Sequence, residues 1–205
     1  MAFPEEIRTD RLVLRRPGEA DAEAIFAGYG RDPEVSRYLT WRPHRSIDDT
    51  RAYIAWLAQN WAAGTHRTYV IDAPARMCAG GIDLRIADEG RSVVFGYVLR
   101  RDLWGLGLMT EALSACVELA LAQPGVWRAW AYCDIDNPAS GRVMEKAGMT
   151  FEGILRCWSL HPNVDPVVPR DCRVYAKVRR PSPAPGYVGT TRLGPAAPQN
   201  VIGQA

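Results

Sequence analysis

Apolar residues recur every three to four positions in two stretches near the start of the chain, the spacing of an amphipathic helix. The first stretch, residues 19–30, places four apolar side chains on one helical face: Ala22, Ile25, Phe26 and Tyr29. The second stretch begins with Ser46 as a predicted N-cap and ends at Gly64, a residue type that commonly stops a helix. Its apolar stripe consists of Tyr53, Ile54, Leu57 and Trp61. We therefore expect helices over residues 19–30 and 46–64.

Short runs of alternating or continuous apolar residues predict strands. The first run is RLVLRR, residues 11–16. Three more follow the second helix: TYVIDA (residues 68–73), CAGGIDLRI (78–86) and SVVFGYVLR (92–100). Turns rich in glycine and charged residues separate these runs, so we expect a meander of antiparallel strands over residues 68–100.

The stretch LWGLGLMTEALSACVELA, residues 103–120, combines a glycine-rich turn with a third helical pattern. The helix is expected to start near Met109 and run to about Gln123, with one apolar face made by Met109, Ala112, Leu113, Cys116 and Ala120. The next strand is VWRAWAYC, residues 126–133. A strand, turn, helix and strand in this order form a βαβ unit, which makes the two strands parallel neighbours. Trp127 and Trp130 point to opposite faces of that strand, so one of them is expected in the core.

The stretch DNPASGRVMEKAG, residues 136–148, predicts a short helix with Pro138 at its first position and Gly148 as its stop. Two further strands, over residues 150–160 and 170–180, complete an α/β (α+β) domain with a mixed sheet. From residue 181 the sequence has no acidic residue and many Pro and Gly residues. We therefore expect one domain over residues 1–180 and a flexible Pro/Gly-rich tail over residues 181–205.

Composition excludes several classes of protein. The 205 residues carry 25 basic and 23 acidic side chains, a net charge of +2, which does not indicate a nucleic-acid partner. The five cysteines are scattered and form no CxxC pair, so we expect neither a metal site nor a disulfide framework. The sequence shows no apolar signal segment and no membrane-spanning run. A reducing, cytoplasmic location without membrane attachment is expected.

The glycine-rich turn has a chemical use. Glycines at 105 and 107 keep bulky side chains away, so that consecutive backbone N–H groups can converge on an anion at the start of a helix. No Gly-Lys-Ser/Thr follows, which excludes the phosphate loop of a nucleotide triphosphatase. A pyrophosphate fits such a nest, although a plain strand-to-helix turn is the better explanation of a lone GxG. The residues concerned are Trp104, Gly105, Leu106, Gly107, Leu108, Met109 and Thr110.

Three stretches in order resemble the GNAT superfamily, the Gcn5-related N-acetyltransferases. They are LWGLGLMTEAL, DNPASGRVMEKAGMTFEGILR and the opening IRTDRLVLRRPGEADAEAIF, and the resemblance spans about residues 7–179. The opening stretch is similar to the RimJ/RimL type, which acetylates protein N-terminal amines such as the N-terminal alanine of ribosomal proteins. The resemblance implies a strongly twisted mixed sheet flanked by helices, and acetyl-CoA as co-substrate. It also implies a splayed parallel strand pair, where Tyr97, Val98 and Leu99 contact the pantetheine arm.

The resemblance also implies roles in the helix that begins at Pro138. Asn137 is expected to cap this helix and, in the family, to contact the pantetheine arm or a bound water. Ser140 resembles the serine proposed to protonate the CoA thiolate in RimL-like enzymes, and an ordinary helix serine explains it equally well. Many relatives carry a tyrosine acid where this chain has Met144, and Gln or Arg where it has Asp102. Methionine cannot donate a useful proton.

Six side chains are candidates for the general base: Asp83, Glu111, Asp134, Asp136, His44 and His161. Each is also explained as a surface charge or a helix cap. Asp83 is our first choice, because in the family its strand borders the acceptor site. Glu111 lies in the first turn of its helix, where the dipole favours a carboxylate, so we interpret it as structural.

The acceptor must offer a neutral amine. An α-amine with a pKa of about 7.7–8.0 is roughly 10% neutral at pH 7, whereas a lysine near 10.4 is below about 0.1%. A site without a tyrosine acid therefore favours an α-amine, attacking acetyl-CoA directly in a ternary complex. In the family the region of Tyr38 and Trp41 forms one wall of the acceptor site; ordinary packing under a loop is the alternative.

Two other functions stay open. The first is acetylation of a small-molecule amine such as an antibiotic or a polyamine, which a strongly acidic acceptor site would support; the sequence has no acidic run. The second is a catalytically inactive CoA-binding module, supported only by the absence of the tyrosine. The sequence also leaves a homodimer open.

Overall fold

One continuous eight-stranded sheet organises the described chain, with the strand order β1-β2-β3-β4-β5-β6-β8-β7. The computed structural model describes residues 3–180, and the predicted tail lies outside the described residues. The strands are β1 (Glu6–Arg8), β2 (Val13–Arg15), β3 (His66–Ala73), β4 (Arg76–Ala87), β5 (Ser92–Leu99), β6 (Arg128–Asp134), β7 (Thr150–His161) and β8 (Asp165–Val178). Every neighbouring pair is antiparallel except β5 and β6, which are parallel as the βαβ pattern predicts.

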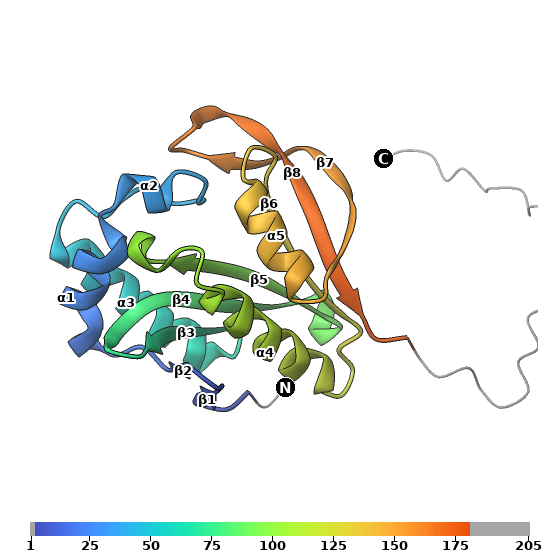
Figure 1. Ribbon diagram of the computed structural model, residues 1–205, viewed down its shortest axis with the longest axis horizontal. Coiled ribbons are helices and arrows are strands. Elements are labelled where there is room, and N and C mark those ends of the chain that lie inside the picture. The colour runs from blue at the N-terminus through green and yellow to red at the C-terminus, as the bar shows by residue number, and fades with distance from the viewer. Residues whose placement is uncertain (1–2, 181–205) are drawn as a thin grey trace, which may run out of the picture.

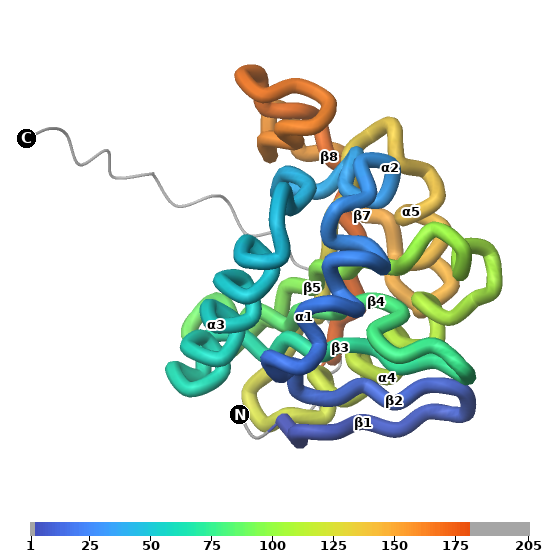
Figure 2. The backbone as a smooth tube through the Cα atoms, turned by 90° about the vertical axis from the view of Figure 1, so that its left-hand side faces the viewer, coloured from blue at the N-terminus to red at the C-terminus, as the bar shows by residue number. Residues whose placement is uncertain are grey.

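Helices cover both faces of the sheet. The α-helices are α1 (Ala22–Ile25), α2 (Pro33–Ser36), α3 (Ile47–Ala63), α4 (Leu108–Ala122) and α5 (Pro138–Lys146). Short 3₁₀ or π segments are η1 (Glu19–Asp21), η2 (Phe26–Gly30), η3 (Asp88–Gly90) and η4 (Arg101–Leu103). Figure 1 shows α4 and α5 in front of the sheet, and Figure 2 shows α1 and α3 on the other side. Two separate apolar clusters result, one under α4 and one under α1 and α3.

The predicted helix boundaries rest on local capping signals, and the structure confirms them. Ser46 and Asp49 form a reciprocal capping box at the start of α3, and Gly64 ends it in the left-handed conformation with φ +75°. The predicted apolar face of α4 is buried in full. Asn137 caps α5 by accepting a hydrogen bond from the Ser140 N–H at 3.2 Å. These signals act within one turn of chain, which is why the sequence displays them.

Other elements differ from the prediction. The helix expected over residues 19–30 is a 3₁₀ turn, one α-helical turn and a π segment, closed by a hydrogen bond from Arg31 N–H to Phe26 O. Strand β1 and helix α2 were not predicted, although Asp32 and Pro33 carry a start signal for α2. The expectation that Trp127 or Trp130 is in the core is wrong, because Trp127 is exposed and Trp130 is half-buried. Trp127 lies just before β6, and no helix of the described residues packs over the face of β6 that carries Trp130.

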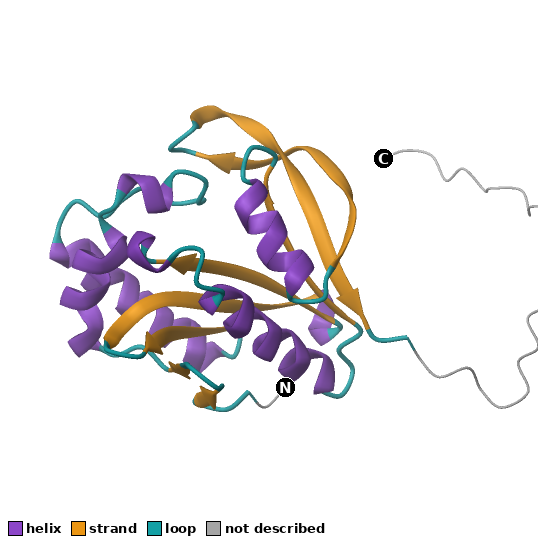
Figure 3. Cartoon of the chain, viewed as in Figure 1, coloured by secondary structure: helices purple, strands orange, loops and turns teal. Residues whose placement is uncertain are grey.

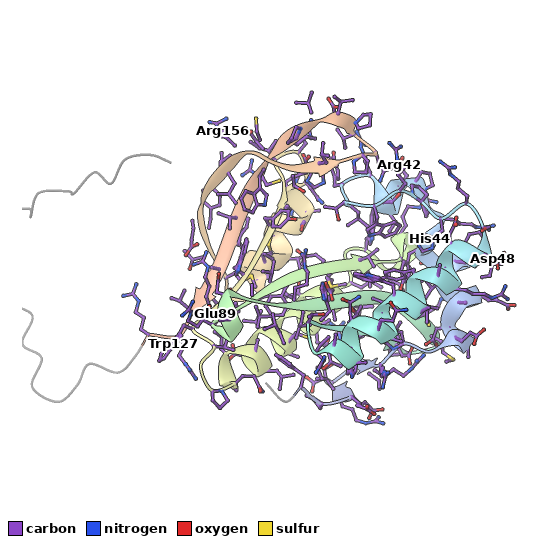
Figure 4. All side chains as sticks on the ribbon, turned by 180° about the vertical axis from the view of Figure 1, so that it is seen from behind. Arg42, His44, Asp48, Glu89, Trp127 and Arg156 are labelled. Atoms are coloured by element: carbon purple, nitrogen blue, oxygen red, sulfur yellow. The ribbon has the colours of Figure 1, made fainter. Side chains whose placement is uncertain are left out.

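Alternation along the strands separates the two faces of the sheet at its centre. On β6, the α4 side carries the buried residues Ala129, Ala131 and Cys133, while Trp130 and Tyr132 on the α3 side are half-buried. Figure 3 shows how α4 and α5 lie along the near face. Figure 4, from behind, shows α3 in front of one half of the sheet and the strands β6 to β8 beyond it. The α3-side face of β4, β5 and β6 is therefore partly open, and we refer to it below as the open face.

Candidate active site

The turn before α4 has the backbone conformation that only glycine adopts easily. Gly105 and Gly107 have φ values of +79° and +77°, and Gly107 is the N-cap of α4. A side chain at Gly105 would meet no atom within 4 Å, so the glycine is required by backbone conformation and not by crowding. Within the described chain, the amides of Gly105, Leu106 and Gly107 donate no hydrogen bond to protein. The turn therefore presents a row of free donors at a helix N-terminus, as an anion requires.

Side chains from distant segments hold this turn in place. Arg11 donates from Nη1 to the Leu106 carbonyl at 3.1 Å, and Trp104 donates from Nε1 to the Leu99 carbonyl at 2.8 Å. The turn is thus attached both to the β1–β2 connection and to the end of β5. A fixed turn loses little entropy when it binds an anion.

Glu111 braces the same region, as its structural interpretation requires. Its carboxylate accepts hydrogen bonds from Thr9 Oγ1 at 2.6 Å, from the Arg11 amide at 2.9 Å and from Arg11 Nε at 2.6 Å. Burial acts to raise the pKa of Glu111, but these hydrogen bonds and the Arg11 charge prevail and lower it. Every oxygen is committed to the β1–β2 connection, so Glu111 is not placed to act as a base.

Strands β5 and β6 separate partway along their length. Their pairing runs from Ser92↔Arg128 to Phe95↔Ala131 and then stops, although β5 continues to Leu99 and β6 to Asp134. Tyr97, Val98 and Leu99 therefore have backbone groups on the β6 side that make no ladder with β6. A ligand that carries amides can complete such an edge. The splayed pair is the arrangement that the family resemblance implies.

Ser140 lies beside a tyrosine whose hydroxyl the sequence does not place there. The Ser140 and Tyr97 hydroxyl oxygens are 2.7 Å apart, and the Tyr97 hydroxyl also lies 3.1 Å from the Ser140 carbonyl oxygen. Burial raises the pKa of Tyr97, so its phenol stays protonated at neutral pH. Met144, at the position where relatives carry a tyrosine, is fully buried in the core. A phenol thus reaches this region from β5 instead of from α5.

Asp83 lies on the opposite face of the sheet at the same level. It pairs directly with Gly96 in the β4–β5 ladder, so its side chain points to the open face, whereas that of Tyr97 points to the α4 side. Thr68 Oγ1 donates to Asp83 Oδ1 at 2.7 Å, and Arg85 Nε lies 3.4 Å from Oδ2. Gly96 is the first residue of β5 beyond the paired segment. Asp83 therefore borders the point where the two strands part.

The other base candidates are engaged elsewhere. Asp134 is fully buried and forms an ion pair with Arg170, which also contacts Asp136 at 2.5 Å. His161 is buried and hydrogen-bonds through Nδ1 to the Tyr38 carbonyl at 2.7 Å. His44 is hydrogen-bonded to Thr50 at 2.7 Å, and burial lowers its pKa. Asp134 also lies on the separated part of β6, but its carboxylate is held by Arg170, so Asp83 is the candidate best placed at the strand opening.

The loop that carries Tyr38 and Trp41 is attached to the tip of the β7–β8 hairpin. Asn163 donates from Nδ2 to the carbonyls of Ser36 and Trp41, both at 2.7 Å. Both Tyr38 and Trp41 are half-buried. Sequence reasoning missed Asn163, and no local signal identifies it, because its partners lie 122 and 127 residues away.

The residues present fit the co-substrate that the resemblance implies. The free amides of the turn suit the pyrophosphate of CoA, and the free edges of β5 and β6 suit the amides of its pantetheine arm. The described residues include no group of three or more His, Cys, Asp or Glu side chains suited to hold a metal ion. Within residues 3–180, no helix combines the length and the apolar character needed to cross a membrane.

Comparison with known proteins agrees with this geometry. A family model described as an acetyltransferase (GNAT) domain matches residues 11–150. The uncharacterized N-acetyltransferase YoaA of Bacillus subtilis (strain 168) is 30% identical over 175 residues, which cover 84% of this chain and 96% of YoaA.

Solved structures with the same fold include two with CoA or acetyl-CoA. The microcin C7 self-immunity acetyltransferase MccE, in complex with acetyl-CoA and AMP, superposes with a TM-score of 0.77 at 20% identity, over 86% of this chain and 98% of MccE. RimL, a ribosomal L7/L12 alpha-N-protein acetyltransferase in complex with CoA, superposes with a TM-score of 0.75 at 23% identity, over 85% of this chain and 98% of RimL. At these identities the likeness establishes the fold. With the family model and YoaA, it shows that the chain belongs to the GNAT family of acetyltransferases and is an acetyl-CoA-dependent N-acetyltransferase.

Proposed function

We propose that the protein acetylates the α-amine of its acceptor, on a protein or peptide N-terminus, by direct attack on bound acetyl-CoA. One observation carries the proposal: at the level where β5 and β6 part, Asp83 lies on one face of the sheet, and Ser140 with Tyr97 lies on the other. A carboxylate and a hydroxyl donor thus flank the opening from opposite sides. Proton removal from an amine and proton delivery to a leaving thiolate need such a pair.

The reaction balances with these groups. The amine nitrogen attacks the thioester carbonyl carbon, so that a C–N bond forms and the C–S bond breaks. The nitrogen loses one proton toward Asp83, directly or through water, and the CoA sulfur gains one from Ser140. Tyr97 is proposed as a positioning residue: either hydroxyl of the Tyr97–Ser140 pair can be the donor, and with the phenol hydrogen on Ser140 Oγ the serine hydrogen is free for the sulfur. Solvent then restores both groups.

The α-amine preference follows from the strength of the base. The Asp83 carboxylate is already shared by Thr68 and Arg85, and an acceptor that is already partly neutral at pH 7 makes the smallest demand on such a base. RimL, an alpha-N-protein acetyltransferase by its description, has the same fold. The proposed cofactor contacts are Tyr97 to Leu99, Trp104 to Thr110, Asn137 and Ser140, with Tyr38 and Trp41 in the acceptor wall.

A small-molecule amine is the second candidate acceptor. MccE, an immunity acetyltransferase by its description and bound to AMP, shares the fold as closely as RimL does. A polyamine is disfavoured within this class. Asp83 faces Arg85, and Glu152 is ion-paired with Arg128, so the carboxylates on this side are already compensated.

Release of CoA thiol with a peptide panel tests the proposal. At pH 7, peptides with a free N-terminus should exceed peptides with a blocked N-terminus and one lysine by roughly 250- to 500-fold in kcat/KM, which is the ratio of their neutral fractions. Faster turnover of the blocked peptide would show that the acceptor is a lysine. Binding of acetyl-CoA without turnover of any amine would identify an inactive module.

Two substitutions on the α5 side test the proton route. Ser140→Ala should lower kcat about 10- to 100-fold with little change in KM for acetyl-CoA, because a thiolate already leaves well. Tyr97→Phe keeps the ring and removes the hydroxyl, and should lower kcat less. Ser159→Ala, on the distant strand β7, is the matched control. An unchanged kcat in Ser140→Ala would leave water as the donor, and a large rise in KM would limit Ser140 to positioning the pantetheine.

A further inference from the structure

A row of aromatic rings runs along the N-terminal half of the molecule beside the open face. Neighbouring ring centroids are 5.5 Å apart for Trp41 and His44, 5.8 Å for His44 and Tyr53, 6.2 Å for Tyr53 and Trp56, and 5.5 Å for Trp56 and His66. We call these five residues the α3 ladder. Burial lowers the pKa of His44, so this ring is neutral at pH 7. Figure 4 labels His44 near the start of α3.

A second aromatic group stands on the other side of the open face. Trp130 and Tyr132 on β6 have ring centroids 6.3 Å apart, and Tyr132 meets Trp158 of β7 edge-on at 6.0 Å. We call these three residues the β6 group. Trp158 is 48% exposed and Trp56, across the face, is 46% exposed. Large exposed aromatic rings that gather on one face of a protein indicate a binding surface for a ligand or a partner.

Strand register places Asp83 between the two groups. Thr68, Asp83 and Gly96 are successive partners across β3, β4 and β5, and Tyr132 follows on β6, one residue beyond the last β5–β6 pair. The position between Asp83 and Tyr132 is Gly96, which has no side chain. Adjacent strands lie about 4.8 Å apart, so roughly 10 Å or more separates the Asp83 and Tyr132 backbones. The Arg85 guanidinium lies over Gly96 in this space, and an aromatic ring can stack on a guanidinium beside the β6 group.

The α3 ladder also borders the strand that carries Asp83. His66, at one end of the ladder, pairs with Arg85 on β4, two residues from Asp83 and on the same face of the sheet. Burial, and after it the negative charge of Asp83, raises the pKa of Tyr53 in the middle of the ladder. Asp83 therefore lies between the α3 ladder and the β6 group.

Arg85 lies beside Asp83 on this face. Its Nε is 3.4 Å from Asp83 Oδ2, an ion pair without a hydrogen bond. The Arg85 guanidinium extends toward Gly96, since a Cβ built there would lie 3.7 Å from Nη2. The Arg85 side chain is 40% exposed, so its other N–H groups can donate to an acceptor atom of a ligand, such as a carbonyl oxygen beside the amine.

We propose that the acceptor carries an aromatic or heteroaromatic ring next to its amine, with the ring bound between the α3 ladder and the β6 group and the amine at Asp83. This inference rests on the proposed function, because it assumes that the amine is acetylated at Asp83. It narrows the acceptor to an aromatic residue at a peptide N-terminus or a small-molecule derivative of an aromatic amino acid. Both sources share the ring, the α-amine and a neighbouring carbonyl group for Arg85.

Amino-acid amides test the ring directly. Phenylalaninamide and tryptophanamide should exceed leucinamide about 10-fold in kcat/KM with saturating acetyl-CoA, measured by thiol release. Cyclohexylalaninamide matches phenylalaninamide in size and in the class of its amine but has no π system. Its kcat/KM should therefore be close to that of leucinamide. A peptide that begins with phenylalanine tells the two sources apart: higher turnover than the amide indicates a protein N-terminus, and lower turnover indicates a small molecule.

Substitutions of tryptophans test which residues produce the preference for an aromatic ring. Trp130→Leu and Trp56→Leu should each lower the ratio of phenylalaninamide to cyclohexylalaninamide toward one, whereas Trp127→Leu, an exposed tryptophan at the entry to β6, should leave it unchanged. Equal turnover of the two amides by the parent protein would overturn the aromatic preference and leave acetyl transfer standing. Acetyl-CoA binding with no turnover of any amide or peptide would overturn the proposed function, and this inference with it.

Discussion

The turn before α4 and the open face differ in how they are built. The turn is one contiguous segment, and its recognition groups are backbone amides fixed by two left-handed glycines. The open face collects side chains from α3, β4, β6 and β7, and the residues are far apart in sequence. A backbone site depends on conformation and tolerates changes of side chain, whereas a side-chain site depends on register and packing. Substitutions should therefore affect the two sites independently.

Gly107→Val should have the largest effect of all the variants, and it should weaken CoA binding without changing the choice of acceptor. A β-branched residue at φ +77° is strained by a few kcal/mol, and relaxing the turn would misalign its amides. We expect the Kd for CoA to rise about 100-fold in calorimetry, with unchanged relative turnover of different amines. Gly125→Val is the matched control, because Gly125 has φ +83° and open space but follows the far end of α4. If the variant binds CoA as tightly as the parent, the turn before α4 does not bind the CoA pyrophosphate.

Asp83→Asn should affect the opposite side of the opening. Asparagine keeps the shape and the contact with Thr68 but cannot take a proton, so kcat should fall about 100-fold. The Kd for CoA should stay the same. Asp48→Asn, an exposed carboxylate on α3, is the control. If kcat of Asp83→Asn stays within about twofold of the parent, Asp83 is not the base.

Asn163→Asp should have an intermediate effect, and it should weaken acceptor binding at the open face without weakening CoA binding. Aspartate retains the size of the side chain and loses both hydrogen bonds that hold the 36–41 loop, so the loop should move away from the hairpin. We expect KM for the acceptor to rise about 5- to 10-fold, with KM for acetyl-CoA unchanged. Asn163→Gln, which keeps the amide, should recover part of the affinity. Equal effects on both KM values would show that the variant only destabilises the fold.

Glu111→Gln should change stability and its pH dependence more than catalysis. The folded pKa of Glu111 is lowered, so its contribution is present above the unfolded pKa of about 4.3 and is lost as pH falls through the folded value. Denaturant unfolding should show a loss of about 1–2 kcal/mol at pH 7 that shrinks below about pH 4. A difference that is constant with pH would mean that the carboxylate charge contributes nothing.

Removal of residues 181–205 should have the smallest effect. We propose that residues 1–180 form the catalytic domain, because the Pro/Gly-rich tail has no periodic apolar face to pack. A chain that ends at Arg180 should keep its melting temperature within about 1–2 °C and its Kd for CoA. A larger drop would assign the tail to the domain or to contacts with another chain.

The sequence by itself determined the features that depend on neighbouring residues. The αL glycines, the Ser46 and Asn137 caps and the apolar face of α4 each act within a few residues, and the structure confirms all of them. The parallel pairing of β5 and β6 also followed from sequence, because the connection through α4 permits only that direction. Together with the family resemblance, these features predicted the fold and the turn that fits CoA.

Only the tertiary structure decided which side chains meet at the proposed reaction centre. Tyr97 was expected to contact the cofactor, but its hydroxyl partner Ser140 is 43 residues away, and their meeting depends on how α5 packs against β5. Trp130 was expected to be a candidate for the core, yet no helix within residues 3–180 covers its face of β6. Sheet register and helix placement are set by the packing of the whole domain, so side chains that meet across strands leave no local pattern to read.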